Sequence, residues 1–324
     1  MKTIKIDFIG FWEGFDKEHN MFTSVLEKKY KIEISNTPDY IFCSMFGDPY
    51  EYCNYDAVRI FYSGENYSPD FNIFDYAMGF DFITYEDRYF RYPISMNNGS
   101  MPAAEKKHLD IADDIISSKP YFCNYIYGNS HAQKERTEIF ELLSTYKRVE
   151  SKGTYLNNDK NNEVISSWED KIAFQSKCKF SIAFESVSQR GFVTEKLIHA
   201  FAAKTVPIYF GDPLIGQQFN EKAFINCRNY KNFNEVLEYI KYLDENDEEY
   251  LKVLREPVWD IGTYNKEHEK LESFIYNIFD QPLEAAYRRP LKFRPYKHDQ
   301  NLKKFNKLSK NRLLFKIVNK FFLK

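Results

Sequence analysis

Short apolar segments of strand length alternate with segments of helical periodicity along most of the chain, and this alternation restricts the fold more than any other feature. The predicted strands are residues 4–9, 32–34, 40–44, 58–62, 122–127, 180–184 and 206–210. The predicted helices are residues 19–30, 133–146, 194–204 and 232–257, the last as one or two helices that stop at Pro257. We therefore expect an α/β fold in which helices cover both faces of parallel sheets. Such sheets bind ligands at their carboxyl edge, so the loops that directly follow strands are candidate sites.

The length and composition suit a protein with two hydrophobic cores. The chain has 324 residues, of which 43% are hydrophobic and 18% aromatic. The polar stretch 97–120 is the predicted boundary, which gives domains at residues 1–117 and 118–280 and a tail at 281–324. The opening segment MKTIKIDFIGFW is interrupted by charges and predicts a strand, not a signal peptide. No uncharged run approaches the ~18 residues that a membrane-spanning helix needs.

The cysteines and the absent motifs exclude several classes of protein. Five scattered cysteines without a CxxC pair predict free thiols in a reducing cytosol, not a disulfide framework or a zinc site. GxGxxG, HExxH, GxSxG and Walker A patterns are missing, which argues against dehydrogenases, zinc proteases, serine hydrolases and P-loop enzymes. The six histidines are dispersed, so we expect no metal centre, and we interpret His131 and His199 as structural.

Positive charge is concentrated at the C-terminus. Residues 288–324 carry 13 Lys and Arg against one acid, Asp299, a net charge of +12. Because the whole chain has a net charge of -2, the remaining 287 residues carry -14. Residues 311–324, NRLLFKIVNKFFLK, predict an amphipathic helix that lies on an anionic membrane surface. The alternatives are nucleic acid, for which no base-reading module is present, a subunit contact, or a disordered tail.

Two cations stand in the first turns of predicted helices that follow strands. Lys196 and Arg136 occupy positions where the helix dipole and free backbone N–H groups favour an anion. Together they could bind a diphosphate, Arg through its planar fork and Lys as a point charge. The alternative is that Glu135, Glu138 and Glu195 pair with them on a solvated face.

Glu65 is a candidate general base. It follows the predicted strand 58–62, and neighbouring Tyr62, Tyr67 and Phe71 could raise the pKa of its carboxyl group. The alternative is that the carboxylate only accepts backbone N–H bonds within its own turn. Further carboxylates that the sequence does not rank are Asp75, Asp81, Glu86 and Asp87.

Three segments resemble one known family. Residues 184–213, FESVSQRGFVTEKLIHAFAAKTVPIYFGDP, resemble the signature of the α-1,3-fucosyltransferases of glycosyltransferase family 10. FYSGENYSPDFNIFDYAMGFD and EDRYFRYPI are similar to the acceptor-domain block of the bacterial members. NYIYGNSHAQKERTEIFELLSTYKRVESKG is similar to the segment that holds their phosphate-binding arginine. The resemblance runs from about Tyr62 to Tyr276.

The resemblance implies roles for individual residues. Lys196 and Arg136 match the cations that bind the diphosphate of GDP-fucose, and Glu65 matches the general base. The other donor-binding positions that it implies are Glu195, Phe192, Ser186, Asn129 and Thr194. The chain departs from the pattern where Ser186 replaces Asn, Phe192 replaces Tyr and Gly128 replaces Ser, and these departures bear on the nucleotide contacts.

The resemblance also implies a fold and an activity. The fold would be two Rossmann-like domains facing each other across a cleft (GT-B), with the acceptor in the N-terminal domain and GDP-fucose in the C-terminal one. The activity would be inverting, metal-independent transfer of L-fucose to N-acetylglucosamine in lactosamine-type glycans, α-1,3 or also α-1,4 linked. The alternatives are an inactive sugar-binding relative or an enzyme that uses another nucleotide sugar.

The expected setting follows from these interpretations. The products would be Lewis-type surface glycans, such as those of lipopolysaccharide or glycoproteins. With the basic tail 288–324 on anionic lipid, we expect a cytoplasmic protein that is peripheral on the inner face of the bacterial membrane and does not bind nucleic acid.

Overall fold

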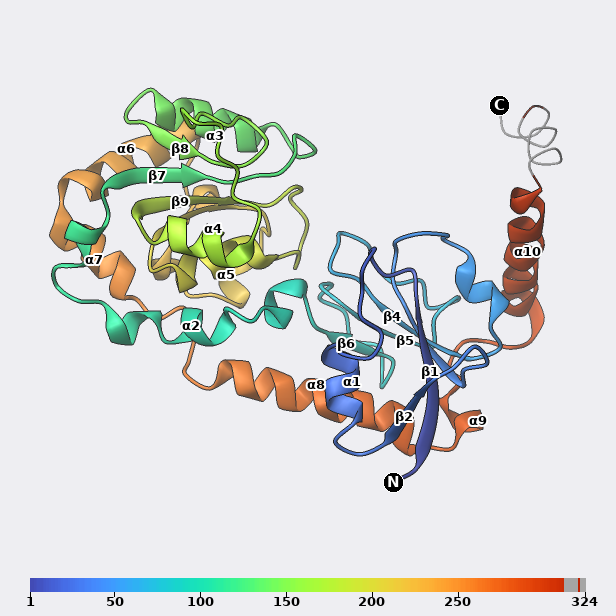
Figure 1. Cartoon of the computed structure of the whole chain (residues 1–324). Coiled ribbons are helices and arrows are strands. Elements are labelled where there is room, and N and C mark those ends of the chain that lie inside the picture. Colours follow the sequence, from blue (N-terminus) through green and yellow to red (C-terminus); the bar gives the residue numbers. More distant parts are fainter. Residues whose placement is uncertain (312–319, 321–324) are drawn as a thin grey trace. The chain divides into compact units, whose positions relative to one another are not determined.

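The computed structural model describes residues 1–311 and residue 320, and the chain divides into two compact units, both of the α/β class (Figure 1). The first unit comprises Met1–Gly79, Ile83–Tyr92 and Glu269–Lys324, and the second comprises Phe80–Phe82 and Pro93–His268. Each has its own parallel sheet, so the expected pair of α/β units is confirmed.

The first unit is built on a six-stranded sheet with the order β2-β1-β3-β4-β5-β6. The strands are β1 (Thr3–Ile9), β2 (Lys31–Ile34), β3 (Tyr40–Cys43), β4 (Val58–Tyr62), β5 (Tyr76–Gly79) and β6 (Tyr89–Arg91). One face carries Phe42 of β3, which stacks on Phe22 of α1 (Met21–Leu26) at 4.4 Å between ring centroids. The same face contacts Phe279 of α8 (Thr263–Asp280). Because side chains alternate along a strand, Ile41 and Cys43 face the opposite side, where they join a core with Phe61 and Phe74.

The second unit is built on a five-stranded sheet with the order β11-β10-β9-β7-β8. The strands are β7 (Tyr121–Tyr125), β8 (Val149–Ser151), β9 (Cys178–Phe184), β10 (Val206–Phe210) and β11 (Ile225–Asn226). Its helices are α2 (Met101–Glu105), α3 (Glu135–Ser144), α4 (Trp168–Gln175), α5 (Glu195–Ala202), α6 (Phe233–Glu245) and α7 (Asp247–Arg255). Helix α5 packs on β9, on β10 and on its neighbour α4. These contacts determine what surrounds the start of α5.

The sequence located seven of the eleven strands of the described residues and missed several helices, including the two longest, α8 and α10 (Phe293–Lys310). β4 and β10 have the predicted bounds, and the predicted helix at 232–257 is two helices, α6 and α7. The four missed strands, β5, β6, β8 and β11, have two to four residues each. Segments of that length show little periodicity, and although β2 and β3 were located at four residues each, these four are identified by their pairing with a neighbouring strand.

The division between the units differs from the predicted boundary at residues 117 and 118. The polar stretch 97–120 that was predicted as the boundary contains α2, and α2 packs on α5 of the second unit. Met101 and Ala104 are fully buried there in a cluster with Leu197 and Phe201. The chain therefore enters the second unit at Pro93, and it returns to the first unit within α8.

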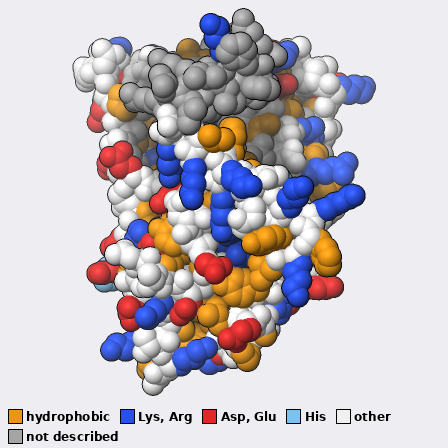
Figure 2. All heavy atoms as spheres, turned by 90° about the vertical axis from the view of Figure 1, so that its right-hand side faces the viewer, with side chains coloured by type: hydrophobic (Ala, Val, Ile, Leu, Met, Phe, Trp, Pro, Cys, Tyr) orange, Lys and Arg blue, Asp and Glu red, His pale blue; other side chains and the backbone are white. Residues whose placement is uncertain are grey.

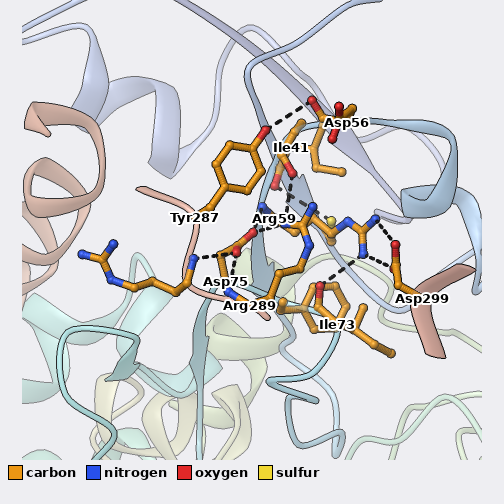
Figure 3. Close-up of polar contacts among 12 residues, drawn as sticks. Ile41, Asp56, Arg59, Ile73, Asp75, Tyr287, Arg289 and Asp299 are labelled. Carbon is orange, nitrogen blue, oxygen red and sulfur yellow. Dashed lines mark hydrogen bonds and ion pairs between the residues drawn. The ribbon is translucent and has the colours of Figure 1, made fainter. Parts of the chain in front are cut away.

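The C-terminal segment, which the sequence predicted as a tail at 281–324, is part of the first unit (Figure 3). Asp75, which has no solvent exposure, accepts hydrogen bonds from the backbone N–H groups of Arg288 and Arg289, both at 2.8 Å. The guanidinium of Arg289 pairs with the same carboxylate. The backbone N–H of Arg59 on β4 also donates to Asp75, at 2.8 Å. One buried carboxylate thus joins the C-terminal segment to the sheet.

A second buried ion pair fixes α10 (Phe293–Lys310), which follows the short helix α9 (Leu283–Ala286). Arg59 has no solvent exposure, and its Nη1 donates to Asp299 of α10 at 2.7 Å (Figure 3). Burial opposes ionisation of Asp299, but the hydrogen bonds and charge of Arg59 outweigh it and lower the pKa of this carboxyl group. The one acid of the basic segment is therefore an internal contact.

The predicted amphipathic helix at 311–324 falls on residues 312–319 and 321–324, which lie outside the described residues.

We expect Asp75→Asn to destabilise the first unit, because Arg289 would keep its charge in a buried place without a counter-ion. Loss of one partner of a buried pair costs about 3–5 kcal/mol, so the urea midpoint should fall clearly. The matched control is Asp56→Asn, which changes an exposed aspartate of the same unit. An unchanged midpoint for Asp75→Asn would show that the C-terminal segment does not depend on this carboxylate.

Candidate functional site

Three loops of the second unit meet at the carboxyl edge of its sheet. They follow β7, β9 and β10 directly. The loop after β7 bonds to the loop after β9, since the backbone N–H of Gln133 donates to the carbonyl of Ser186 at 2.9 Å. The loop after β9 bonds to the end of β10, since Ser188 Oγ donates to the carbonyl of Gly211 at 2.8 Å. This edge is where open parallel sheets bind ligands.

Lys196 lies at the start of α5, beside three side-chain oxygen atoms. Its Nζ is 2.9 Å from Thr194 Oγ1, 3.3 Å from Glu195 Oε1 and 3.4 Å from Glu185 Oε2. Burial alone would lower the pKa of Lys196, but the two carboxylates outweigh it and raise that pKa. The ammonium is therefore held charged and in place, and the predicted pairing with Glu195 is present.

Glu185 is the residue that the sequence analysis missed. Its side chain is fully buried, and it accepts hydrogen bonds from the backbone N–H of Thr194 at 2.8 Å and from Thr194 Oγ1 at 2.7 Å. Burial raises the pKa of this carboxyl group. A Cβ atom on Gly211 would lie 2.6 Å from Glu185 Cγ, so only glycine fits beside it. One feature of the sequence could have identified Glu185: it is a charged residue that directly follows the apolar end of the strand, Ile182 to Phe184.

Lys171 of α4 is a further cation beside this cluster. The ring of Trp168 on the same helix lies 5.2 Å from that of His199 on α5, and Lys171 is one helical turn further along that face. Burial opposes ionisation of Glu195, but Lys196 and then Lys171 outweigh it and lower the pKa of Glu195 to about 2. Within residues 1–311 and 320, no hydrogen bond or ion pair is found for the Lys171 ammonium.

Arg136 is buried at the start of α3, and no acidic partner for it is found among the described residues. Its side chain is 4% exposed, and the guanidinium lies 4.3 Å from the centre of the Tyr127 ring. The Nε atom has no hydrogen-bond partner in the described part of the chain. Glu138 pairs with Lys134 instead, at 3.0 Å, so the alternative of a solvated pair is wrong for Arg136. A buried guanidinium with an unused donor indicates a missing acceptor.

The other predicted donor-binding residues have different surroundings. Phe192 is 2% exposed, and its ring packs edge-on against Phe80 at 5.3 Å. Ser186 supplies the carbonyl that holds the loop after β7. Asn129 is exposed, and its Oδ1 accepts the backbone N–H of His131 at 2.9 Å. His199 is fully buried with Nε2 3.1 Å from Asn98 Nδ2, which agrees with a structural role.

Glu65 belongs to the first unit, in the loop that follows β4. Glu65 is exposed, and two hydrogen bonds of its backbone hold the turn. The Tyr67 N–H donates to the Glu65 carbonyl at 2.7 Å. The Glu65 N–H donates to Ser63 Oγ at 3.0 Å. Two of the unranked carboxylates, Asp75 and Asp87, pair with arginines of the C-terminal segment, which removes them as candidates for a base.

The second-unit cluster is suited to an anion with hydroxyl groups. Arg136 and Lys171 retain donors for phosphate oxygens, and the ionised Glu195 can accept hydrogen bonds from hydroxyl groups. In formal charge, Glu185 and Glu195 balance Lys196 and Arg136, and Lys171 and Arg228 add positive charge at this edge. Across the described residues, no three His, Cys, Asp or Glu side chains gather as a metal site, and no helix has the length and apolarity to cross a membrane.

Two parallel α/β units, one with a cation–carboxylate cluster at its carboxyl edge, are typical of nucleotide-binding α/β proteins. Two family models match the chain: the alpha-(1,3)-fucosyltransferase FucT N-terminal domain at residues 6–97, and the glycosyltransferase family 10 (fucosyltransferase) C-terminal domain at residues 116–272. The chain therefore belongs to the family 10 fucosyltransferases.

Curated relatives and solved structures agree with the family. The alpha-(1,3)-fucosyltransferase FucT of Helicobacter pylori is 31% identical over 291 residues, which cover 78% of this chain and 60% of that protein. The human 4-galactosyl-N-acetylglucosaminide 3-alpha-L-fucosyltransferase 9 is 27% identical over 138 residues, 42% of this chain and 37% of that protein. The chain thus spans about 60% of the length of its Helicobacter relative.

Crystal structures of an alpha1,3-fucosyltransferase are similar along most of their length. The structure with GDP has a TM-score of 0.71 and 27% identity, covering 89% of this chain and 93% of that one. The structure with GDP-fucose has a TM-score of 0.68 and 25% identity, covering 85% and 91%.

We expect inorganic pyrophosphate to bind the second-unit cluster and Lys171→Met to weaken that binding about tenfold, the usual effect of losing one charge-assisted contact. Titration calorimetry at low salt measures it. Lys177→Met, which removes an exposed lysine just beyond α4, is the control and should leave the affinity unchanged. Equal affinities for both variants would place Lys171 outside the anion site.

Proposed function

We propose that the chain transfers L-fucose from GDP-β-L-fucose to a hydroxyl group of N-acetylglucosamine in lactosamine-type glycans, with inversion at the anomeric carbon. The observation that carries the proposal is the arrangement of Lys196, Arg136 and Glu195 at the carboxyl edge of the second sheet, in a chain of the fucosyltransferase family. This arrangement suits a diphosphate attached to a sugar.

The reaction needs a base at the acceptor and positive charge at the leaving group. The acceptor oxygen attacks the anomeric carbon of fucose from the face opposite GDP, and its proton passes to the Glu65 carboxylate. The bond from that carbon to the β-phosphate oxygen breaks, and GDP departs with the electron pair. Arg136 and Lys196 stabilise the negative charge that develops on the diphosphate. Fucose that was β-linked to GDP becomes α-linked to the glycan.

The remaining donor contacts are assigned from their surroundings. Glu195, with its pKa near 2, is ionised at neutral pH and accepts hydrogen bonds from hydroxyl groups of the donor. Thr194 and Ser186 hold the loop that borders the donor. Asn129 lies exposed in the loop after β7, and the buried Phe192 forms part of the wall of the donor site. Because side-chain cations neutralise the diphosphate, the proposed mechanism requires no metal ion.

We propose α-1,3 linkage, with α-1,4 as the alternative, and products of the Lewis type on lipopolysaccharide or glycoprotein. An inactive sugar-binding relative is the competing interpretation, and an enzyme that uses a different nucleotide sugar is another. Retention of Glu65, Arg136, Glu195 and Lys196 favours an active enzyme, since a binding module has no use for a base.

The proposal is tested by incubating the full chain with GDP-fucose and type 1 and type 2 disaccharides, then identifying products by mass and linkage. We expect transfer that EDTA does not reduce. Glu65→Gln should lower kcat by roughly 10²-fold with unchanged GDP affinity, as expected for loss of a general base. Glu13→Gln, an exposed glutamate of the same unit, is the control. Binding of GDP-fucose without any product would support the inactive relative, and restoration by Mn²⁺ after EDTA would contradict metal independence.

We further propose that the protein is cytoplasmic and rests on the inner face of the bacterial membrane through the basic surface of α10. Lys and Arg side chains gather on the face of the molecule that Figure 2 shows. A hollow of about 430 Å³ on this helix is lined by Lys303, Lys304 and Lys307 together with Gln300, Cys53 and Asn54. Anionic lipid headgroups suit such a hollow, and each lysine near the surface contributes about 1 kcal/mol.

Flotation with vesicles containing phosphatidylglycerol tests the membrane proposal. At low salt we expect the full chain to float, and the double variant Lys304→Gln, Lys307→Gln to float much less, since both exposed lysines lose their charge. The control Lys231→Gln, Lys266→Gln removes the same charge elsewhere on the surface. If both double variants lost vesicle binding equally, the binding would depend only on net charge and not on the surface of α10. If the wild type did not bind the vesicles, the proposal would be contradicted.

A further inference from the structure

The first unit contains a cavity that the proposed mechanism does not use. Its volume is about 320 Å³, within the range of small-ligand sites. Its wall includes Gly10, which directly follows β1, and Ser44, which directly follows β3. The cavity therefore lies at the carboxyl edge of the first sheet, where ligands of parallel sheets bind. Tyr67, in the same loop as Glu65, also lines it.

The far wall of the cavity comes from the C-terminal helix. His298 and Leu302 of α10 line it, and the adjacent Asp299, whose side chain is 14% exposed, pairs with the fully buried Arg59 of the sheet. The pairing of Asp299 with Arg59 thus fixes the wall (Figure 3). The α10 segment closes a site that the sheet alone would leave open.

The lining combines aromatic rings with hydrogen-bond acceptors. Tyr50, Tyr52 and Tyr67 supply aromatic surface, and the carboxylates of Glu51 and Asp48 supply acceptors. Asp48 is 3.4 Å from Lys310 and accepts the Tyr50 N–H, whereas for the Glu51 carboxylate no partner is found within residues 1–311 and 320. Such a lining disfavours an anion and suits a neutral ring that has apolar C–H faces and several hydroxyl donors.

We propose that this cavity binds a neutral sugar unit of the acceptor glycan beyond the disaccharide that receives fucose. The inference rests on the proposed function, because it takes the acceptor to be a glycan. Glu51 accepts hydrogen bonds from the hydroxyl groups of that sugar, the tyrosines contact its C–H face, and His298 closes the site from α10. The cavity would make the enzyme prefer extended chains.

The test compares a lactosamine disaccharide with a tetrasaccharide of two lactosamine units, using the full chain. We expect the wild type to have about tenfold higher kcat/KM for the tetrasaccharide, through a lower KM. Glu51→Gln and His298→Ala should each abolish this preference, so that the two kcat/KM values become about equal. Their kcat/KM for the disaccharide should stay within about twofold of the wild type. The control is Glu27→Gln, at an exposed position of the same unit away from the cavity. Unfolding midpoints confirm that the variants are folded.

Binding of the tetrasaccharide without donor gives a second readout, by titration calorimetry, and Glu51→Gln should weaken it about tenfold. If both variants keep the wild-type preference and affinity, or if the wild type has no preference for the tetrasaccharide, the cavity is not an acceptor subsite. Transfer to the disaccharide would persist in that case, so the proposed function would stand. Tetrasaccharide binding that depends on Glu51, in a protein that transfers no fucose, would support the subsite and contradict the activity.

Discussion

Every strand pairing found in the described residues is parallel, and the positions of the functional groups follow from this constraint. Parallel neighbours need crossovers, so all strands of a sheet deliver their following loops to one edge. In the second unit this edge brings together Glu185 after β9, Gly211 after β10 and the loop that leads to Arg136. In the first unit it brings together Glu65 and the cavity that Tyr67 lines.

Each unit contains a buried pair of opposite charges. Asp75 with Arg289 and Glu185 with Lys196 are buried pairs that also receive backbone hydrogen bonds. An unpaired charge in such a place would be costly, so each pair fixes the segments that it joins. Other buried cations of the second unit, Lys107 and Lys119, donate to backbone carbonyls instead. For Arg136 no acid is found among the described residues, and an anionic ligand would complete it.

The C-terminal segment shows that a count of charged residues does not predict where their side chains lie. Its excess of Lys and Arg predicted a single basic surface that binds anionic lipid. In the structure Arg289 and Asp299 are internal contacts, while Lys304 and Lys307 remain on the surface. A count of charges does not distinguish a side chain that enters the core from one that stays in solvent, because that depends on what the sheet places opposite it.

The sequence by itself determined the α/β class, seven of the strands and several helices, and the placing of Lys196 at a helix start, because these depend on periodicity and neighbours in the chain. Only the tertiary structure decided that Glu185 holds Lys196, that Lys171 lies beside them, and that the C-terminal segment completes the first unit. Arg59 and Asp299 are separated by 240 positions, and no local pattern records such a pairing. It exists because folding leaves a buried guanidinium that needs a carboxylate, and the chain supplies one from its far end.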